Sequence, residues 1–522
     1  MGGGLMQLVA YGAQDIYLTG NPQITFFKVV YRRHTNFSME AIEQTWNGTS
    51  DGTNGRCTAT ISRNGDLVHK MYLEVSGKTS SCNPGVSWIK TVELEIGGQK
   101  IDKHSGVWME TWAELTQKNP DYRSGTVTGE AFNARNDPWH RFRGPTPFQN
   151  LAGYGGVSRS CVDLQDRDVN YYVPLQFWFC RNVGLALPLI ALQYHEVKVI
   201  LEHEIKSIFG TGSKNKLYAD YIYLDTDERR RFAQVSHEYL IEQVQEHQLL
   251  DQSTNNLNFN HPVKELIWTS YTDGCEKSTF DDAEKQFWAD EGVHGYKKDG
   301  LRLKSLFNNE FLNYMPRNQG EEIQNKMNAA GKLNSEYSLL LNGHKRFSSR
   351  PSTYFSRTQV IEHHTGPGGI NLWEAIATNA ADDWSAGWFC DQEERAMAVP
   401  SYSQDYRLGF PYTNVAHPVR SDDTSETTFT GHCTYKAACG EGLSDAICVY
   451  SFALKPEEHQ PSGTCNFSRI DNAQLVSDSA FLLGDLRYTN DETTHNYTAV
   501  IFAVNYNVLR IMSGMGGLAY SN

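Results

Sequence analysis

Three stretches of the sequence carry residue types that could bind a phosphate or a metal ion. Residues 210–214 read GTGSK, but the spacing of a phosphate-binding P-loop, GxxxxGK followed by Ser or Thr, is not met. His195 and Glu196 could begin a zinc-binding HExxH motif, yet the next histidine is His203 and the segment has strand character. A surface hairpin for residues 210–214 and a solvated sheet face for the histidines are therefore the favoured interpretations. His363 and His364 are adjacent, so on a strand their side chains would point to opposite faces, and a pair in a loop is the simpler interpretation.

The remaining reactive side chains are scattered along the chain. The ten cysteines form no CxxC pair, and a structural zinc site needs two close pairs. No serine lies in a GxSxG nucleophile motif. The sequence therefore predicts no catalytic residue, no cofactor-binding residue and no metal site, and it favours a protein that is not an enzyme.

Asparagine-linked glycosylation is the covalent modification that the sequence patterns suggest. Four N-x-S/T sequons occur, at Asn36, Asn47, Asn466 and Asn496. Such tripeptides also arise by chance, and the first ten residues, MGGGLMQLVA, lack the charged region and long apolar core of a secretory signal. The four asparagines are therefore candidate acceptor sites whose use depends on where the chain is made.

Composition narrows the class of protein. Hydrophobic residues make up 39% of the 522 residues and aromatic residues 12%, which predicts a folded chain of two or three domains. The formal net charge of −14 argues against a protein that coats nucleic acid, because such a protein needs a basic face. No run of 18 apolar residues occurs, so the sequence predicts no transmembrane helix.

The elements that would position these residues are mostly strands, beginning with residues 23–37, QITFFKVVYRRHTNF. Their β-branched and aromatic side chains suit a strand that is buried on both faces. Pro22 stops any helix that runs in from upstream, because the residue before a proline is disfavoured in the α region. We therefore expect residues 23–37 to form the founding strand of a large all-β protein, with most of the chain packed against it.

The next segments alternate apolar and polar residues. Residues 56–63 do so strictly, as is typical of a half-buried strand. Residues 64–65, Asn-Gly, predict a hairpin turn. A second strand follows over residues 67–75, with one face formed by Leu67, Met71, Leu73 and Val75.

The clearest strand is predicted over residues 86–96. Its apolar side chains recur at period two, at Val86, Trp88, Val92, Leu94 and Ile96. Residues 97–98, Gly-Gly, then predict a two-residue hairpin that returns through Ile101.

One convincing helix follows in the first half of the chain. Ser105 can cap it, and Trp108, Trp112 and Leu115 share one face at helical spacing. Residues 119–120, Asn-Pro, end it. Strand character then returns at residues 171–180, 192–201 and 217–224, which brings the first half to about eight strands, a count that suits a sandwich of two four-stranded sheets, a jelly roll.

The second half resembles the first in its pattern. Residues 225–232, DTDERRRF, are charged, and Asp225 or Thr226 can cap a short connecting helix. Strand character then returns over residues 238–244, 263–268, 446–454 and 498–511. A second sandwich fits this half.

These features divide the chain into four parts: an N-terminal arm (1–22), a first sandwich (23–224), a connector (225–237) and a second sandwich (238–522). Residues 270–336 and 366–445 match a compact core poorly. We expect them to be long surface insertions of the second sandwich, and separate small domains are the alternative.

Six blocks of sequence carry a resemblance to a known family. They are residues 12–37 (GAQDIYLTGNPQITFFKVVYRRHTNF), 187–203 (LPLIALQYHEVKVILEH), 217–245, 341–347 (LNGHKRF), 450–472 (YSFALKPEEHQPSGTCNFSRIDN) and 505–522 (NYNVLRIMSGMGGLAYSN). In this order they resemble the major capsid proteins of nucleocytoplasmic large DNA viruses, the mimivirus-, phycodnavirus- and iridovirus-like capsid proteins. The resemblance covers most of residues 10–260 and 337–522 and departs in the two insertions.

The resemblance implies a fold and an assembly. The expected fold is a double jelly roll of two eight-stranded antiparallel sandwiches that stand side by side. Three chains would form a pseudo-hexagonal capsomer, and many capsomers would tile the icosahedral shell of a large double-stranded DNA virus. The implied partners are the chain itself, neighbouring capsomers, minor capsid and penton proteins, and an internal viral membrane at the N-terminal face. The implied location is the virion, assembled in the host cytoplasm, without direct binding of nucleic acid.

Two other classes of function compete with this one. Trp373, Trp384 and Trp388 lie in the second insertion, and exposed tryptophans can stack on sugars, as in a carbohydrate-binding sandwich. Packing of these tryptophans within the loops is the simpler interpretation. A sandwich enzyme would need converging titratable groups, which the sequence does not supply.

Overall fold

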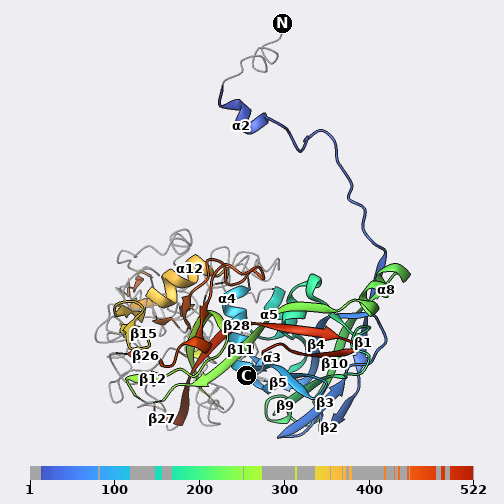
Figure 1. Ribbon diagram of the computed structural model, residues 1–522. Helices are drawn as coiled ribbons and strands as arrows, with labels where there is room; N and C mark the ends of the chain where they lie inside the picture. Colours follow the sequence, from blue (N-terminus) through green and yellow to red (C-terminus); the bar gives the residue numbers. More distant parts are fainter. Residues whose placement is uncertain are drawn as a thin grey trace.

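The computed structural model describes most of the two strand-rich regions and the segment that precedes them. The described residues are 13–117 apart from 80–82, 147–155, 167–272 apart from 251, 336–371 apart from 353, 367 and 369, 447–477, 484–487 and 494–520, with a few short strand pairs in between. Most of the two predicted insertions lies outside them. Two sandwiches lie side by side, and the N-terminal segment projects away from both (Figure 1).

The first sandwich has two antiparallel sheets. One has the strand order β1 (Phe37–Gln44), β10 (Lys214–Leu224), β4 (Leu67–Thr79) and β7 (Arg167–Pro174), with the short β8 (Leu187–Pro188) beside β4. The other has the order β2 (Trp46–Gly48), β3 (Gly55–Thr60), β9 (Val197–His203), β5 (Ile89–Ile96) and β6 (Gln99–Ser105).

The order of these strands defines the topology. Without the short β2 and β8, eight described strands remain, and numbered along the chain they give a sheet of order 1-8-3-6 facing a sheet of order 2-7-4-5. This is the strand order of a jelly roll, in which two Greek keys fold into facing sheets. The jelly roll predicted for the first half is confirmed.

The second sandwich repeats this topology. One sheet contains β11 (His237–Gln248), β28 (Thr494–Met512), β13 (Pro262–Thr272) and β24 (Ile447–Ser451), joined by β14 (Leu312–Asn313), β25 (Cys465–Asn466), β27 (Gly484–Arg487) and β29 (Met515–Leu518). The other contains β12 (Thr254–Asn256), β26 (Ala473–Ser477), β15 (Glu336–Leu341) and β16 (His344–Lys345), with β17 (Arg350–Pro351) beside β15. The eight principal strands, numbered 1 to 8 along the chain, are β11, β12, β13, β15, β16, β24, β26 and β28. They again give sheets of order 1-8-3-6 and 2-7-4-5, so the chain contains two jelly rolls of the same connectivity.

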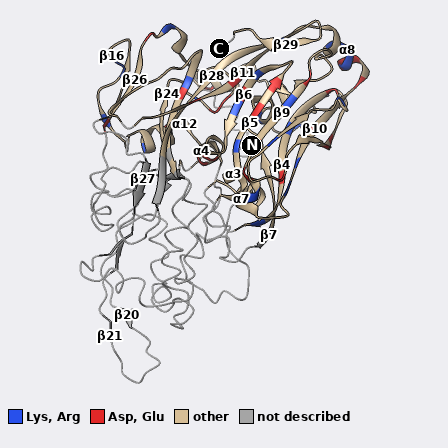
Figure 2. Cartoon of the chain, turned by 90° about the horizontal axis from the view of Figure 1, so that it is seen from below, with Lys and Arg blue, Asp and Glu red and all other residues tan. Residues whose placement is uncertain are grey.

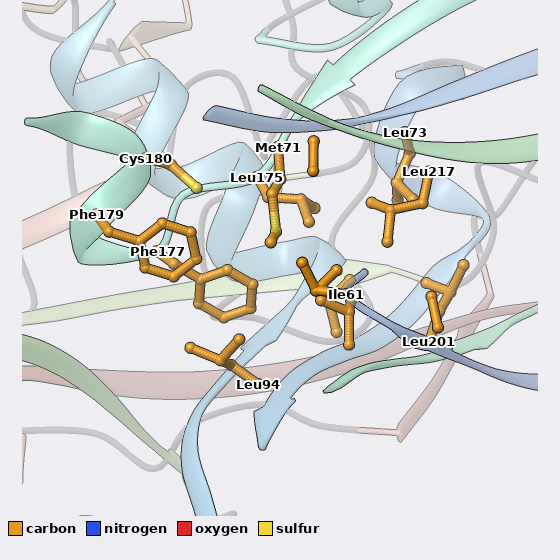
Figure 3. Close-up of a cluster of buried hydrophobic side chains, with 14 of the residues drawn as sticks. Ile61, Met71, Leu73, Leu94, Leu175, Phe177, Phe179, Cys180, Leu201 and Leu217 are labelled. Atoms are coloured by element: carbon orange, nitrogen blue, oxygen red, sulfur yellow. The ribbon is translucent and has the colours of Figure 1, made fainter. Parts of the chain in front are cut away.

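Each sandwich has its own core. In the first, strands of both sheets direct alternate side chains inward, so that Met71, Leu73, Leu94 and Leu201 meet between the sheets (Figure 3). In the second, Trp268 packs against Tyr337 and Phe355 with ring centroids 5.4 and 5.2 Å apart.

A helix fills the space between the two sandwiches. α4 (Gly106–Thr116) leaves the first sandwich after β6 and lies between the strands of both (Figure 2). Its Trp108 is buried against Phe502 of β28, with ring centroids 5.1 Å apart. The long β28 is therefore buried on both faces, with Val500, Phe502 and Val504 toward α4 and Ala499, Ile501 and Ala503 toward the second core.

Several local predictions are confirmed. Ile96 pairs with Gln99 around a turn in which Gly97 and Gly98 both have positive φ, as a type I′ hairpin requires. The Ser105 hydroxyl caps α4 by accepting from the Trp108 amide at 3.2 Å. The predicted connector is α8 (Thr226–Gln234), whose first turn donates from the Asp227 and Glu228 amides to the Asp225 carboxylate.

The predicted founding strand over residues 23–37 is wrong. The first strand begins at Phe37, and residues 23–36 form no strand pair. Phe26 and Phe27 are 89% and 98% exposed, although burial was expected. Their β-branched and aromatic side chains favour a strand, but a strand also needs a partner strand, and no strand of the described chain pairs with residues 23–36.

Four smaller predictions also need correction. Residues 64–65 do not form a hairpin, because β3 and β4 belong to different sheets and the chain crosses between them. Val86 is buried but lies in a short helix, α3 (Pro84–Ser87), because Pro84 starts a helical turn there. The strand expected over residues 171–180 ends at Pro174 and is followed by α6 (Trp178–Arg181). The strand expected over residues 192–201 begins only at Val197, in β9.

A bulge explains why one face of β4 is not uniform. Met71 is opposite Ala219 and Val68 is opposite Tyr221, so β4 has one residue more than β10 over this interval. The extra residue reverses the alternation. Leu67 therefore packs in a separate cluster with Ala186, whereas Met71 belongs to the main core.

Candidate functional site: the exposed N-terminal segment and the junction of the sandwiches

Residues 13–36, called here the N-terminal segment, contain the largest run of exposed apolar side chains in the described chain. Apart from the short helix α2 (Asp15–Thr19), they are extended or irregular. Eight of their apolar side chains are at least 72% exposed: Tyr17, Leu18, Ile24, Phe26, Phe27, Val29, Val30 and Tyr31. Exposed apolar surface of this extent marks a site of interaction.

The junction of the two sandwiches holds a buried ionic network. The Glu242 carboxylate on β11 accepts from Lys264 Nζ at 2.8 Å and pairs with an Arg181 guanidinium nitrogen at 2.8 Å. Lys264, on β13, is completely buried, and its ammonium also donates to the Pro456 carbonyl and lies 5.5 Å from the centroid of the Tyr506 ring. Burial opposes ionisation of Glu242, but Arg181 and Lys264 outweigh it and lower the pKa of that carboxyl.

A second charged cluster lies beside the first. His364 follows α12 (Gln359–His363) and is buried, with Nε2 3.0 Å from Glu265 Oε2 and Nδ1 3.0 Å from Glu457 Oε1. Burial would lower the pKa of His364, but the two carboxylates overcome it and raise the pKa to about 9. Glu457 is fixed in turn by the Thr365 amide at 2.9 Å.

A β-bulge brings the two clusters together. On β13, Val263 is opposite Asn505 and Glu265 is opposite Val504, so Lys264 is an extra residue in the pairing with β28. A regular strand would send Lys264 and Glu265 to opposite faces, whereas a bulge can bring consecutive side chains to the same side. Both are fully buried here, and each finds an opposite charge.

These clusters join the second sandwich to the first. Arg181 comes from α6, and its guanidinium carbon lies 5.0 Å above the Trp112 ring of α4. The Trp112 ring also meets the His364 ring edge to face at 6.5 Å. Beyond His364, the Gly366 amide donates to the Leu115 carbonyl at 2.7 Å and so satisfies the C-terminal end of α4.

The geometry of the junction favours cohesion over chemistry. Its charged groups are paired with one another, and Glu242, Lys264, Glu265 and His364 are buried. Among the described residues, no group of three or more His, Cys, Asp or Glu side chains is arranged to hold a metal ion. Burial raises the pKa of the Cys57 and Cys180 thiols to about 12, so both are neutral at physiological pH (Cys180 is in Figure 3).

A narrow cleft runs between the facing edges of β6 and β11. Its volume is about 420 Å³. Two hydrogen bonds cross it, from the Gln243 side chain to the Ile101 carbonyl and from the Val244 amide to Asp102 Oδ1 at 3.1 Å. The cleft is therefore part of the contact between the sandwiches. It is lined by Gln99, Lys100, Ile101, Asp102, Lys103, Gln243, Val244, Gln245 and Leu518.

The histidines that the sequence suggested have structural roles. His195 lies in the loop before β9, not in a strand, and its Nδ1 meets the Gly516 carbonyl of β29 at 2.8 Å. His203 is buried at the end of β9, where its Nε2 donates to the Thr49 carbonyl at 3.0 Å, and burial lowers its pKa. Residues 210–213 form the turn between α7 (Ile205–Phe209) and β10, which begins at Lys214, so the predicted hairpin is wrong because a helix precedes the turn.

The candidate glycosylation sites fall in different surroundings. Asn36 and Asn47 are exposed, the first in the N-terminal segment and the second in β2. Asn466 is also exposed, but its side-chain oxygen already accepts from the Ser468 amide at 3.1 Å. Asn496 lies in β28 opposite Asp485. Trp373, Trp384 and Trp388 lie outside the described residues.

Comparison with known protein families identifies both halves of the chain. Residues 25–225 match the family model described as the major capsid protein N-terminus. Residues 228–372 and 435–517 match the model described as the large eukaryotic DNA virus major capsid protein. The chain belongs to the family of large DNA virus major capsid proteins. It is a structural component of a virion, and its fold is the double jelly roll that the sequence resemblance implied.

Curated relatives extend over the whole capsid chain. The major capsid protein of Pyramimonas orientalis virus is 43% identical, that of Paramecium bursaria Chlorella virus 1 is 35% identical, and capsid protein 1 of Acanthamoeba polyphaga mimivirus is 33% identical. Each alignment covers 100% of this chain and 100% of the relative.

Solved structures agree with this assignment. The crystal structure of PBCV-1 VP54, fitted into a reconstruction of the virophage Sputnik, superposes with a TM-score of 0.57 at 29% identity and covers 95% of this chain and 100% of VP54. The Faustovirus major capsid protein shares the fold with a TM-score of 0.50 at 11% identity, over 96% of this chain and 94% of that protein.

Sequence reasoning missed the ionic network in this capsid protein. His364 was interpreted as a loop residue, and Lys264 and Glu265 were not singled out. One signal was present, because adjacent charged residues interrupt the apolar stretch over residues 263–268. The other partners, such as Glu457, come from distant positions and converge only in the fold.

Among the described residues, no helix combines the length and the apolarity that a bilayer crossing requires.

Proposed function

We propose that this major capsid protein self-assembles into homotrimeric, pseudo-hexagonal capsomers that tile the icosahedral shell of a large double-stranded DNA virus. The observation that carries the proposal is the repeated jelly-roll connectivity of the two sandwiches. Two similar sandwiches in each of three chains give six similar lobes around one axis, so a trimer can occupy a position in a hexagonal lattice.

The buried junction supports this assembly. A pseudo-hexagonal outline requires the two sandwiches of a chain to keep a fixed relative orientation. The ion pair between Arg181 of the first half and Glu242 of the second, together with α4, whose Trp108 packs on Phe502, joins them. We expect a trimer interface that buries roughly 2,000 to 5,000 Å² and is apolar at its centre, with smaller and more polar contacts between capsomers.

The proposed partners follow from the same assembly. They are other copies of the chain, neighbouring capsomers, minor capsid proteins and penton proteins, with an internal viral membrane at the N-terminal face. Direct binding of nucleic acid is not part of the proposal, because the net charge of −14 repels a polyanion. We also propose that assembly takes place in the host cytoplasm and that the protein has a purely structural, non-enzymatic role.

We also propose the division of the chain that the sequence suggested. It consists of an N-terminal arm (1–22), a first domain (23–224), a connector (225–237) and a second domain (238–522) with surface insertions at about 270–336 and 366–445. Asn36, Asn47, Asn466 and Asn496 are proposed glycan acceptors. Residues 23–36 act with the arm, because they pair with no strand of the first sandwich.

Electron microscopy of the purified chain tests the proposed capsomer. We expect class averages viewed along the symmetry axis to have a six-lobed outline with threefold symmetry, since each chain contributes two lobes. Two-lobed particles at every concentration, or particles with twofold symmetry, would contradict the proposal. Variants at exposed Tyr194 serve as a control that should leave the outline unchanged.

A further inference from the structure

Part of the N-terminal segment, residues 24–35 (ITFFKVVYRRHT), has the character of a strand but no strand partner. Phe26, Phe27 and Tyr31 are 87–98% exposed. The hydrogen bonds within residues 23–36 are local, from the Phe27 amide to Thr25 Oγ1 at 3.3 Å and between His34 Nδ1 and the Thr35 carbonyl at 2.7 Å. Apart from a turn at residues 26–28, the backbone has no regular structure of its own, and its β-branched and aromatic side chains suit a strand that joins a sheet edge.

A matching edge exists on β1. This strand pairs with β10 on one side, and no strand of the described chain pairs with its other side. The exposed edge carries unpaired backbone groups, which is the arrangement to which an extended segment can add. Phe37 and Met39 of β1 are 51% and 46% exposed, so the edge also offers apolar contact.

The charges of the two strands are complementary. Residues 24–35 contain Lys28, Arg32 and Arg33 and no acidic residue, whereas β1 contains Glu40 and Glu43 and no basic residue. Acidic side chains on an exposed edge discourage two β1 strands from pairing with each other. The same side chains favour a strand that carries positive charge.

The position of the segment points to another molecule. Residues 24–35 precede β1 directly and run away from the sandwiches (Figure 1). Twelve extended residues span about 40 Å, enough to reach a neighbouring chain. We propose that residues 24–35 of one chain add as a strand to the free edge of β1 in a second copy. This inference rests on the proposed function in one respect, that assembly brings copies together.

An anionic membrane surface is the competing partner for a basic, aromatic segment. Segments that lie in a membrane interface are typically amphipathic helices, which satisfy their own backbone groups. Residues 24–35 form no helix, and apart from a turn at residues 26–28 their N–H and C=O groups would be unpaired in a bilayer. The backbone therefore favours a sheet edge over a membrane.

Photo-crosslinking tests the pairing in the full-length chain. Benzoylphenylalanine replaces Phe27, the purified protein is irradiated, and the products are separated under denaturing conditions. One chain is 59.0 kDa, so a crosslink between two copies gives a band at twice this mass, about 118 kDa. We expect that band, with the crosslink mapped by mass spectrometry to residues 37–44. The same probe at Tyr194, which is 75% exposed on the first sandwich, is the control and should not label residues 37–44.

Charge reversal makes the test specific. Arg33→Glu or Glu40→Lys alone should lower the yield of the 118 kDa band roughly threefold to fivefold, and the double variant should restore it. Crosslinks confined to the 59.0 kDa band, a site outside residues 37–44, or preferential labelling of lipid when phosphatidylserine vesicles are added would each overturn the pairing. A trimer mass without the 118 kDa band overturns this inference alone. A monomer mass at every concentration overturns the proposed function as well.

Discussion

Replacing Lys264 with alanine is expected to lower the free energy of unfolding by about 3–5 kcal/mol, because it leaves the buried Glu242 carboxylate with one cationic partner fewer. Lys264 is completely buried, and its ammonium contacts both Glu242 and the Pro456 carbonyl. Denaturant titration followed by tryptophan fluorescence, at one fixed protein concentration, measures the change.

A matched control separates this effect from the loss of any lysine. Lys216 pairs with Glu43 at 3.1 Å on the surface, where both side chains are about half exposed. Lys216→Ala should cost far less than Lys264→Ala, because exposed ion pairs contribute little. Lys264→Met keeps the apolar stem and should still be strongly destabilising, and adding Glu242→Gln should recover part of the loss. If Lys264→Ala cost no more than Lys216→Ala, the buried Glu242–Lys264 pair would not stabilise the second sandwich.

Raising the pH from about 6.5 to 9 is expected to destabilise the capsid protein by up to about 3 kcal/mol through His364. The pKa of His364 is raised to about 9 in the folded chain, against an ordinary value of 6.5. The folded state therefore binds the proton more tightly than the unfolded state. The stabilisation is complete below pH 6.5 and is lost as the pH rises through 9. Unfolding free energies measured at steps between pH 6.5 and 8.5 give the slope.

Neighbouring histidines provide the controls for this slope. His363→Gln should preserve it, since His363 bonds a backbone carbonyl and no carboxylate in the described chain. His364→Gln should flatten it while lowering stability at pH 6.5. Burial lowers the pKa of His203 and His459 from the ordinary value of 6.5, so their titration does not produce the slope between pH 6.5 and 8.5. A wild-type slope equal to that of His364→Gln would exclude the proposed role of His364.

Local signals predicted much of the fold. The Gly97–Gly98 turn, the Ser105 cap of α4 and the Asp225 cap of α8 are short-range features, and each lies where the sequence placed it. Alternation of apolar residues located β3 and β5, and strand character located β11 and β28, for the same reason. Such patterns depend on contacts between near neighbours, which a sequence displays directly.

What the sequence did not predict depends on partners at a distance. Residues 23–36 have high strand propensity, but propensity does not supply a partner strand, and no strand of the described chain pairs with them. The Asn64–Gly65 dipeptide suggested a hairpin, whereas the jelly-roll connectivity sends the chain to the other sheet. The burial of Lys264 and Glu265 depends on one extra residue in β13, and a bulge of this kind has no clear signature in a single sequence.

The solution mass of the purified full-length chain tests the central claim most directly. One chain is 59.0 kDa, so a trimer is three times that mass, about 177 kDa. We expect sedimentation velocity to give the trimer mass and to give it again on dilution, because an interface of roughly 2,000 to 5,000 Å² is characteristic of obligate assemblies. A species of 59.0 kDa that persists as the concentration rises would contradict self-assembly into capsomers.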